Sequence, residues 1–210
     1  MTDKLSLYNG ALTVLGERSI TALTDPGEPR IILDTVFNRC IASCLATSAW
    51  VWAMRGVVLD YDPSIKPDFG FTFAYKQPSD LVRIYALSDN ENFGIPLEDY
   101  VDEAGYWYAW LTPLYARYVS NDPAYGGDLA NYTDSYAEYV EWSLARRACR
   151  RITSSEEKFK AIIQGEEKFK KQAIARDGIA DPVGFPPYGT WSQSRMRRLG
   201  DRTPTSKLIG

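Results

Sequence analysis

The 210-residue sequence contains no histidine. Histidine is the commonest general base near neutral pH and the commonest ligand for transition metals. Its absence excludes every serine or cysteine triad that uses imidazole. The three cysteines, Cys40, Cys44 and Cys149, are too few and too irregularly spaced for a disulfide framework. Cys40 and Cys44 lie one helical turn apart, so a zinc pair is conceivable, but we expect all three to be small buried residues.

Long apolar runs are also missing from the sequence. No stretch approaches the roughly 18 apolar residues of a membrane span, and the N-terminus is too polar for a signal peptide. We therefore expect synthesis in the cytoplasm and no membrane partner. The net charge of −3, from 24 basic and 27 acidic residues, is typical of neither a nucleic-acid binder nor a disordered acidic chain. No Gly-rich phosphate-binding loop is present, and we expect no cofactor.

One long helix is predicted from Asp25 to Thr47. Asp25 is suited to the N-cap, Pro26 to the first helical position, and Glu28 would complete a capping box. Apolar residues then recur every three or four positions, which predicts one buried face. We expect the rest of the chain to be organised around this helix. The residues of its apolar face are Leu33, Val36, Phe37, Cys40, Ile41, Cys44 and Leu45.

Three further helices are predicted over residues 3–15, 128–152 and 154–176. Gly16 is expected to stop the first of them, and Gly178 should follow the end of the last. Each carries apolar residues at helical spacing, so each needs a partner for its apolar side.

The last two of these helices carry charged and aromatic residues in regular positions. The fourth helix repeats Glu-Glu-Lys-Phe-Lys with a ten-residue offset, which places Phe159 and Phe169 on one broad side. The third helix ends in a run of four arginines that finishes at Arg151. These cations could meet phosphates, but a helix C-terminus favours positive charge, so we expect them to pair with Glu156 and Glu157.

Residues 57–120 have a different character, being rich in proline, glycine and aromatic residues without a helical period. Five strands are predicted there, at 69–75, 81–87, 97–102, 106–111 and 114–119. Short strands joined by tight turns favour an antiparallel sheet.

These elements together predict an α+β, mainly α protein. Its expected architecture is a four-helix bundle with an inserted small antiparallel β region and an extended C-terminal arm. The bundle would comprise residues 1–55 and 121–178, the β region residues 56–120, and the arm residues 179–210.

Six carboxylates lie within residues 88–104, a stretch that contains no basic residue. A pair of them could act as acid and base in a glycosidase, and a loosely bound Ca²⁺ is conceivable. Nothing in the sequence distinguishes one carboxylate from another, and the ligand spacing of a calcium loop is absent. We therefore expect no catalytic residue and no metal among these acids. They are Asp89, Glu91, Glu98, Asp99, Asp102 and Glu103.

The end of the chain is basic, in contrast to the rest. Residues 191–210 hold five basic residues and one acidic residue, a net charge of +4, whereas residues 1–190 carry −7. This patch could bind DNA, but contact with an acidic protein surface is the favoured interpretation. The residues expected to make it are Trp191, Arg195, Arg197, Arg198 and Arg202.

Four short motifs and one helix, in this order, resemble the head-to-tail adaptor, or connector, proteins of tailed phages, of the tail tubular protein A type. The motifs are Ala-Leu-Thr-Val-Leu-Gly-Glu at 11–17, Trp-Val-Trp at 50–52, Tyr-Lys-Gln-Pro-Ser-Asp-Leu-Val-Arg-Ile at 75–84 and Leu-Tyr-Ala-Arg-Tyr-Val at 114–119, followed by the helix at 136–152. The resemblance covers roughly residues 5–176.

The resemblance implies a structural virion protein at the head–tail junction. Identical copies would form a ring, expected to be a dodecamer, that joins the capsid portal to the next tail or nozzle protein. DNA would pass through the ring without specific binding. The arm 179–210 would dock on the portal or on a neighbouring subunit, and the acids at 89–103 would line the channel or contact a subunit. The polar side of the long helix, with Arg30, Asp34 and Asn38, is a further candidate for subunit contact.

Two other functions stay open on the sequence. One is a carboxylate-dependent, tail-associated hydrolase that uses two of the acids within residues 88–104. The other is a DNA-binding packaging accessory protein that uses the basic C-terminal residues.

Overall fold

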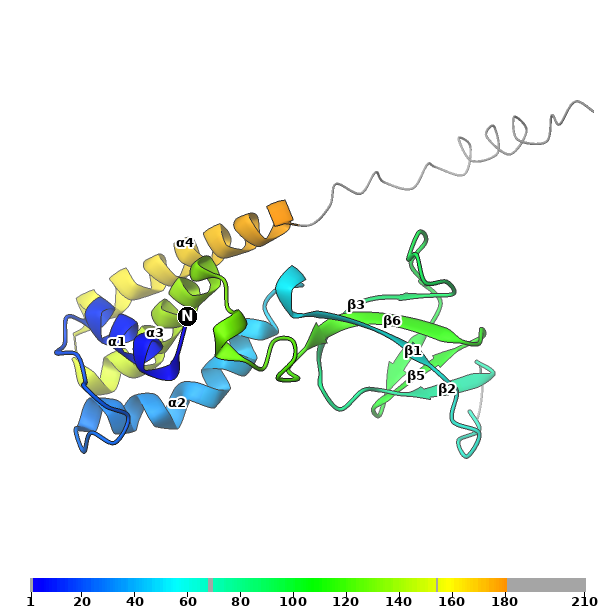
Figure 1. Ribbon diagram of the computed structural model, residues 1–210, viewed down its shortest axis with the longest axis horizontal. Coiled ribbons are helices and arrows are strands. Elements are labelled where there is room, and N and C mark those ends of the chain that lie inside the picture. Colours follow the sequence, from blue (N-terminus) through cyan, green and yellow to red (C-terminus); the bar gives the residue numbers. More distant parts are fainter. Residues whose placement is uncertain (1, 68–69, 154, 181–210) are drawn as a thin grey trace, which may run out of the picture.

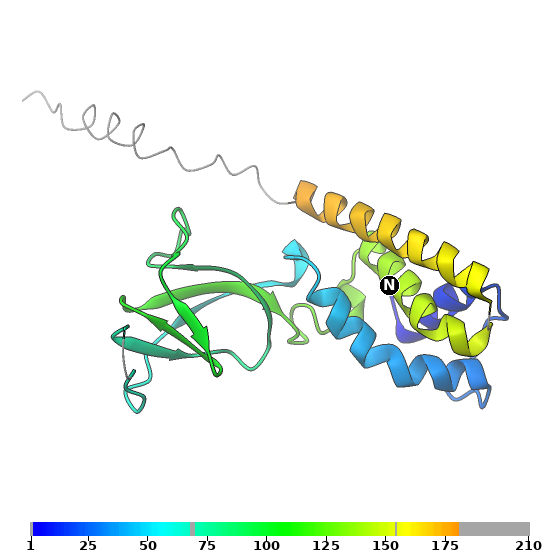
Figure 2. The same cartoon turned by 180° about the vertical axis from the view of Figure 1, so that it is seen from behind.

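The computed structural model describes residues 2–67, 70–153 and 155–180. The chain forms two lobes that lie side by side, with helices at one end and strands at the other (Figures 1 and 2). The elements, in order, are α1 (Lys4–Leu15), α2 (Glu28–Leu45), η1 (Val51–Ala53), β1 (Met54–Leu59), β2 (Phe73–Lys76), β3 (Leu81–Ser88), β4 (Val101–Glu103), β5 (Tyr106–Ala109), β6 (Leu114–Ser120), η2 (Leu129–Asn131), α3 (Asp134–Ile152) and α4 (Glu156–Ala180). We call the four α-helices with η2 the helical lobe, and Met54–Ser120 the β lobe.

The central helix of the helical lobe is α3, and the expectation that the chain is organised around residues 25–47 is wrong. Helices α1, α2 and α4 each pack against α3, which lies between α2 and α4 in both views (Figures 1 and 2). Nine of the 19 residues of α3 are buried. The physical reason is that α2 has one apolar side, whereas α3 is covered on several sides by its three partners.

Helix α2 starts three residues later than predicted. Its N-cap is Gly27, which has no side chain to accept a hydrogen bond, and Pro29 lies in the first turn. Asp25 accepts a hydrogen bond from the Gly27 N–H at 2.8 Å, so its carboxylate closes the turn that precedes the helix. The predicted capping box is therefore wrong.

The predicted apolar face of α2 is largely confirmed. Its buried residues are Ile32, Leu33, Phe37, Cys40, Cys44 and Leu45. Val36 and Ile41 are only partly buried. All three cysteines of the chain are buried and unpaired, as expected for small apolar residues.

Helix α4 is longer than predicted. It continues to Ala180, so Gly178 lies inside the helix and the first two residues assigned to the arm belong to it. The last turns of α4 contact η1, where the Asp177 carboxylate accepts a hydrogen bond from the Val51 N–H at 2.9 Å. The C-terminal end of α4 therefore lies near the boundary between the lobes (Figures 1 and 2).

The two phenylalanines of the repeated motif both contact side chains of α3, which agrees with their predicted position on one broad side of the helix. The Phe159 ring lies 4.4 Å from the Arg150 guanidinium, and Phe169 stacks on Trp142 with ring centroids 5.0 Å apart. The expected pairing of the arginine run is confirmed for Arg150, which lies 3.9 Å from Glu156.

A second ion pair between these helices was not predicted. Arg146 Nε lies 2.5 Å from Glu166 Oε2, so the first arginine of the run pairs with the middle of α4.

The β lobe consists of two three-stranded antiparallel sheets. Sheet A has the order β1-β6-β3 and sheet B the order β2-β5-β4. The central strand β6 places Ala116 opposite Val57 on one side and Leu87 on the other. The sheets enclose a core of their own, formed by Tyr75, Leu87, Trp107, Ala109, Leu114, Ala116 and Tyr118.

The predicted fold class, a four-helix bundle with an inserted small antiparallel β region, is wrong. Helices hold 45% and strands 18% of the described residues, and the strands form two sheets, so the chain has a mixed α/β fold. Strand β1 was not predicted, because Met-Arg-Gly-Val-Val-Leu does not alternate between apolar and polar residues. Of the strand predicted at 97–102, only Val101 and Asp102 belong to a strand, which is β4.

The lobes are joined by a side chain from the start of β3. The Arg83 guanidinium donates hydrogen bonds to the carbonyl oxygens of Ala46 and Thr47 at 3.2 and 2.8 Å, at the C-terminal end of α2. These carbonyls have no partner within the helix, and a cation is favourable there. Val82 and Val119 pack against the core of the helical lobe, so polar and apolar contacts hold the boundary together.

Asp80 links the neighbouring ends of β1 and β6 through hydrogen bonds. Its carboxylate accepts hydrogen bonds from Arg55 at 2.8 Å, from Tyr118 at 3.1 Å and from Ser120. Burial raises the pKa of Asp80, but the bonds from Ser120, Arg55 and Tyr118 outweigh it and hold that pKa below its ordinary value. Burial and the bond to Asp80 raise the pKa of Tyr118 to about 12. The network therefore holds β1 and β6 together within the β lobe.

Candidate interaction surface on the β lobe

Exposed large apolar side chains concentrate on the β lobe. Nine such residues are exposed in the described part of the chain, and six of them belong to this lobe. Val58 and Tyr85 lie on sheet A and Val101 lies on sheet B, so the six are not one continuous patch, and only those that lie together can mark a contact site for another molecule. The six residues are Val58, Tyr61, Tyr85, Ile95, Val101 and Trp110.

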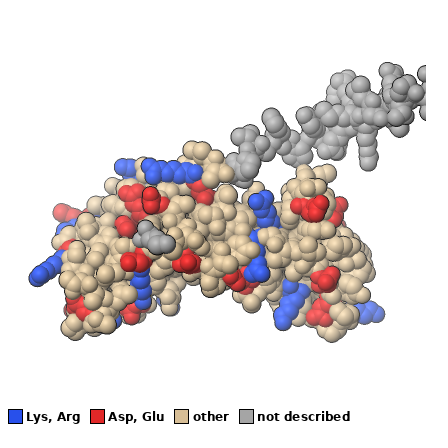
Figure 3. Space-filling view, in the orientation of Figure 1, with Lys and Arg blue, Asp and Glu red and all other residues tan. Residues whose placement is uncertain are grey.

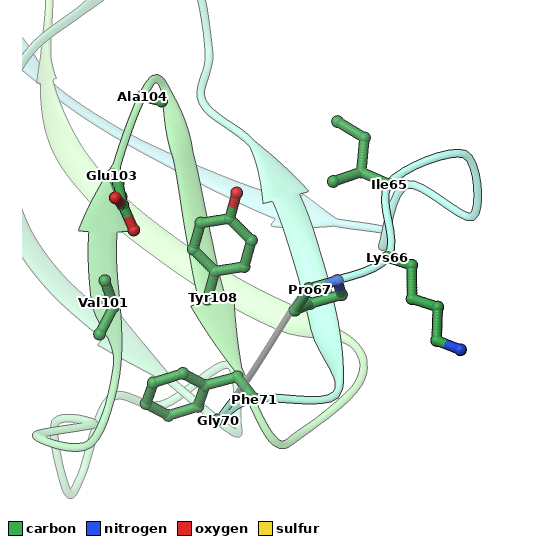
Figure 4. Close-up of a pocket in the computed structure, with 9 residues that line it drawn as sticks. All are labelled: Ile65, Lys66, Pro67, Gly70, Phe71, Val101, Glu103, Ala104 and Tyr108. Carbon is green, nitrogen blue, oxygen red and sulfur yellow. The ribbon is translucent and has the colours of Figure 1, made fainter.

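A cavity of about 370 Å³ lies on the outer side of sheet B (Figure 4). Strand β5 places Trp107 and Ala109 in the core, so Tyr108 points outward and forms part of the cavity. Val101 and Glu103 of β4 lie beside it, and the segment that precedes β2 supplies the opposite wall. We call this cavity the aromatic pocket. Its lining residues are Ile65, Lys66, Pro67, Gly70, Phe71, Val101, Glu103, Ala104 and Tyr108.

The hairpin that carries these residues is tightly turned. Ala104 and Gly105 have φ values of 51° and 82°, which suits the two-residue turn between β4 and β5. The turn fixes Glu103 relative to Tyr108, because the two strands pair in register with Glu103 opposite Tyr106.

The aromatic surface continues beyond the pocket. The rings of Phe71 and Trp110 lie 5.2 Å apart at an angle of 50°, and 54% of Trp110 is exposed. Aromatic pairs of this kind provide a large contact area, and their side chains lose little conformational entropy when a partner binds. Phe71 therefore belongs both to the pocket and to the exposed surface beside it.

The two acids of β4 have different surroundings. Asp102 accepts hydrogen bonds from Gln77 Nε2 at 2.7 Å and from Trp107 Nε1 at 3.2 Å, so it stabilises sheet B. Glu103 lines the aromatic pocket, and its carboxylate lies on the Tyr108 side, whereas Lys66 extends away from that ring (Figure 4). Within the described residues, no Lys or Arg lies at ion-pair distance from Glu103.

The remaining predicted acids do not join the pocket. Asp89 accepts a hydrogen bond from Asn90 Nδ2 at 2.6 Å in the turn after β3. Glu91, Glu98 and Asp99 are exposed. In the part of the chain that the structure describes, no group of three or more His, Cys, Asp or Glu is arranged to hold a metal ion. Only Glu103 of the six acids lines the pocket.

The predicted contact residues of the arm lie outside the described residues. They are Trp191, Arg195, Arg197, Arg198 and Arg202.

The polar side of α2 is engaged within the protomer. Asp34 accepts hydrogen bonds from Lys4 at 2.6 Å and from the Tyr8 hydroxyl at 2.9 Å, and these bonds lower its pKa. Arg30 donates to the Asp25 carbonyl oxygen at 2.8 Å. Asp34 thus holds α2 to α1, and Arg30 fixes the turn that precedes α2. A subunit contact at Arg30, Asp34 and Asn38 stays a prediction.

Sequence reasoning missed Phe71, Tyr108 and Trp110. A signal for two of them exists in Tyr-Trp-Tyr-Ala-Trp at 106–110, where Trp107 and Ala109 alternate with three aromatic residues. Successive side chains of a strand point to opposite faces. When both faces carry aromatic residues, one set lies outside the core, where it is either exposed or covered by another part of the protein. The contribution of Phe71 depends on the fold and has no such signal.

No protein-family model matches the chain, and no curated protein matches it. Among the described residues, no helix combines the length and the apolar character that a bilayer-spanning segment needs.

Proposed function

We propose that the protein is a structural component of the head–tail junction of a tailed phage. Identical copies would form a ring that joins the capsid portal to the next tail or nozzle protein and extends the DNA channel. The observation that carries this proposal is the exposure of Val101 in the aromatic pocket and of Trp110, which contacts the pocket residue Phe71. Such a surface becomes favourable when another protein covers it.

The positions of the connector-like motifs support a structural role. Tyr75 and Trp50 are fully buried, Asp80 fastens β1 to β6, and Arg83 joins the lobes. The residues that carry the resemblance therefore maintain the shape of the protomer. A subunit of a ring needs such a fixed shape, because the angle between neighbouring copies decides whether the ring closes.

The composition of the pocket favours docking over hydrolysis. A glycosidase of the usual kind uses two carboxyl groups that flank the scissile bond. Among the described residues, the aromatic pocket is lined by one carboxylate, that of Glu103, together with Lys66 and aromatic and aliphatic side chains.

The face of the described residues shown in Figure 3 lacks the charge pattern of a DNA-binding surface. The face shown in Figure 3 carries acidic and basic side chains in small separate groups over both lobes, without one continuous basic band. A protein that binds the phosphate backbone of DNA has Lys and Arg side chains clustered on one face.

The proposal is tested by the mass of the full-length protein, alone and mixed with purified portal. We expect a ring on the portal, and we expect deletion of residues 191–210 to prevent attachment. Trp110→Ser should reduce ring formation at least tenfold, because it removes an exposed aromatic side chain. The matched control is Leu23→Ser, which removes an apolar side chain that is 41% exposed on the helical lobe.

Two results would overturn the proposal. One is normal attachment of the truncated protein to the portal. The other is an equal loss of assembly in Trp110→Ser and Leu23→Ser, which would assign no special role to the β lobe.

A further inference from the structure

Each sheet of the β lobe has two edge strands, and one edge of each sheet is covered by another segment of the chain. On the outer edge of β3, the Leu87 carbonyl oxygen accepts a hydrogen bond from the Leu97 N–H at 2.7 Å. On the outer edge of β2, the Ala74 carbonyl oxygen accepts one from the Asp62 N–H at 2.8 Å. These bonds obstruct the addition of a further strand at either edge.

The other two edge strands, β1 and β4, have no such cover. Within the described residues, no backbone hydrogen bond joins residues 55–59 to a strand other than β6, or Val101–Glu103 to a strand other than β5. Strand β1 pairs with β6 at every position from Met54 to Leu59 without a bulge, whereas the pairing of β3 is interrupted by register shifts. A flat edge without proline or a bulge can accept a strand from another molecule.

The side chains beside the two free edges complement each other. Val58 of β1 and Val101 of β4 are 58% and 41% exposed. Two positions before Val58, Gly56 is exposed and pairs with Arg117 of β6, and a Cβ atom at Gly56 would meet open space. Two positions after Val101, Glu103 projects from the same face of β4 (Figure 4). Within the described residues, no acid lies at ion-pair distance from Arg117 and no base at that distance from Glu103.

We propose that β4 of one copy adds to the free edge of β1 of the next copy as an antiparallel strand, with Val101 opposite Val58 and Glu103 opposite Gly56. In this register the two valines form an apolar cross-strand pair. Glu103 would lie two strand spacings, about 10 Å, from the backbone of β6. Because Gly56 has no side chain to stand between them, the Glu103 carboxylate can reach the Arg117 guanidinium and form charge-assisted hydrogen bonds.

This inference rests on the proposed function, because it names the contact between neighbouring copies of the ring. Each copy gives β1 to one neighbour and β4 to the other, so the contact is heterologous, as a ring of this kind requires. Pairing of β1 with β1 of a second copy would be isologous and would end at two copies. Charge favours the heterologous pair, because β4 supplies the acid that Arg117 lacks in a pair of β1 strands.

The experiment mixes two cysteine variants of the full-length protein, Val58→Cys and Val101→Cys, under mild oxidation, with and without purified portal. Directly opposite residues of an antiparallel pair are close enough for a disulfide, so we expect about tenfold or more of a two-chain product over either variant alone. Its bond should join positions 58 and 101. The native cysteines are buried, so each variant offers one accessible thiol. The matched control is Ile95→Cys, at a 62% exposed residue of the same lobe, which should give no product with Val58→Cys.

An exchange of charges tests the register. Glu103→Lys in the Val101→Cys chain should lower the yield about fivefold or more, because it places a lysine beside Arg117. Arg117→Glu in the Val58→Cys chain should then restore the yield. The control for the first change is Glu98→Lys, a charge reversal at an exposed acid outside β4, which should leave the yield unchanged.

Several results would overturn the inference. They are the absence of a bond between positions 58 and 101, a product of Val58→Cys with itself, and an equal product with Ile95→Cys. Equal losses from Glu103→Lys and Glu98→Lys, or no rescue by Arg117→Glu, would refute the register. A ring on the portal without the 58–101 bond would refute this contact alone, whereas the bond without attachment to the portal would refute the head–tail function alone.

Discussion

Gly10 of α1 lies directly beneath the carboxylate of Glu141 on α3. A Cβ atom at position 10 would be 2.1 Å from Glu141 Cδ, so only glycine leaves this space free. The carboxyl group is half-buried between the two helices. Burial, followed by repulsion from Glu138, raises the pKa of Glu141 from its ordinary 4.5 to about 7.

This pKa predicts a pH-dependent stability. Because the folded state favours the protonated form, the free energy of unfolding should fall as the pH rises from about 4.5 to about 7. Glu141→Gln removes the charge and should raise the free energy of unfolding at pH 8 by roughly 1–3 kcal/mol, with almost no effect at pH 4.5. Urea unfolding at both pH values measures the difference. Glu138→Gln is the control, with a smaller gain expected, and a gain from Glu141→Gln that is equal at both pH values would contradict the assignment.

The stack of Trp142 on Phe169 depends on a glycine of α4. A Cβ atom at Gly165 would be 2.1 Å from Trp142 Cζ3, and the indole ring cannot move without leaving Phe169. Gly165→Ala should therefore lower the free energy of unfolding by roughly 1–3 kcal/mol, although alanine is the better helix former.

The matched control for this change is Gly178→Ala in the same helix. A Cβ atom there has open space, so this substitution should be neutral or stabilise the protein by up to about 1 kcal/mol. Thermal unfolding of the two variants separates contact from helix propensity. Equal midpoints would mean that α4 does not pack closely on Trp142.

The network around Asp80 should contribute much of the stability of the β lobe. Asp80→Ala leaves Arg55 without its 2.8 Å ion pair and leaves Tyr118 and Ser120 without their acceptor. We expect a loss of roughly 2–4 kcal/mol, measured by denaturant unfolding. Asp62→Ala removes an acid that bonds only to Ser64 nearby and should change stability by less than about 0.5 kcal/mol. Similar losses in the two variants would show that the network contributes little.

Phe37 should be essential for the helical lobe. Its ring meets that of Tyr8 edge-on at 5.5 Å, and only 7% of the residue is exposed. Phe37→Ala should lower the free energy of unfolding by about 3–5 kcal/mol, measured by urea unfolding. Asn38→Ala, at the next and exposed position of α2, is the control and should have little effect. A loss below about 1 kcal/mol for Phe37→Ala would mean that this part of the core can collapse around the gap.

The sequence predicted what depends on local pattern. The helix predicted over residues 3–15 with Gly16 as its stop is observed from Lys4 to Leu15, and Asp3 proves to be its N-cap. The apolar spacing of α2 likewise located its buried side, but not its first residue, because a carboxylate can close a preceding turn as readily as it caps a helix.

Features that depend on the fold could not be predicted in this way. Strand β1 lacks alternation, and its role becomes clear only when it pairs with β6. The aromatic pocket needs Phe71 and Tyr108, which are 37 residues apart and meet only through the arrangement around sheet B. Glu103 was identified as one acid of six, and its distinct surroundings follow from that arrangement.

The insertion of the β lobe between α2 and α3 imposes an order on folding during synthesis. The β lobe can fold once β6 has left the ribosome, because its core lies entirely within Val57–Tyr118. Helices α1 and α2 must wait for α3, their common partner, which is completed at Ile152. At about 5–20 residues per second, the roughly 100 residues after α2 take about 5–20 s to translate. Throughout that interval the apolar sides of the first two helices are uncovered, so chaperones that shield nascent chains should matter more for this protein than for one whose helices follow each other directly.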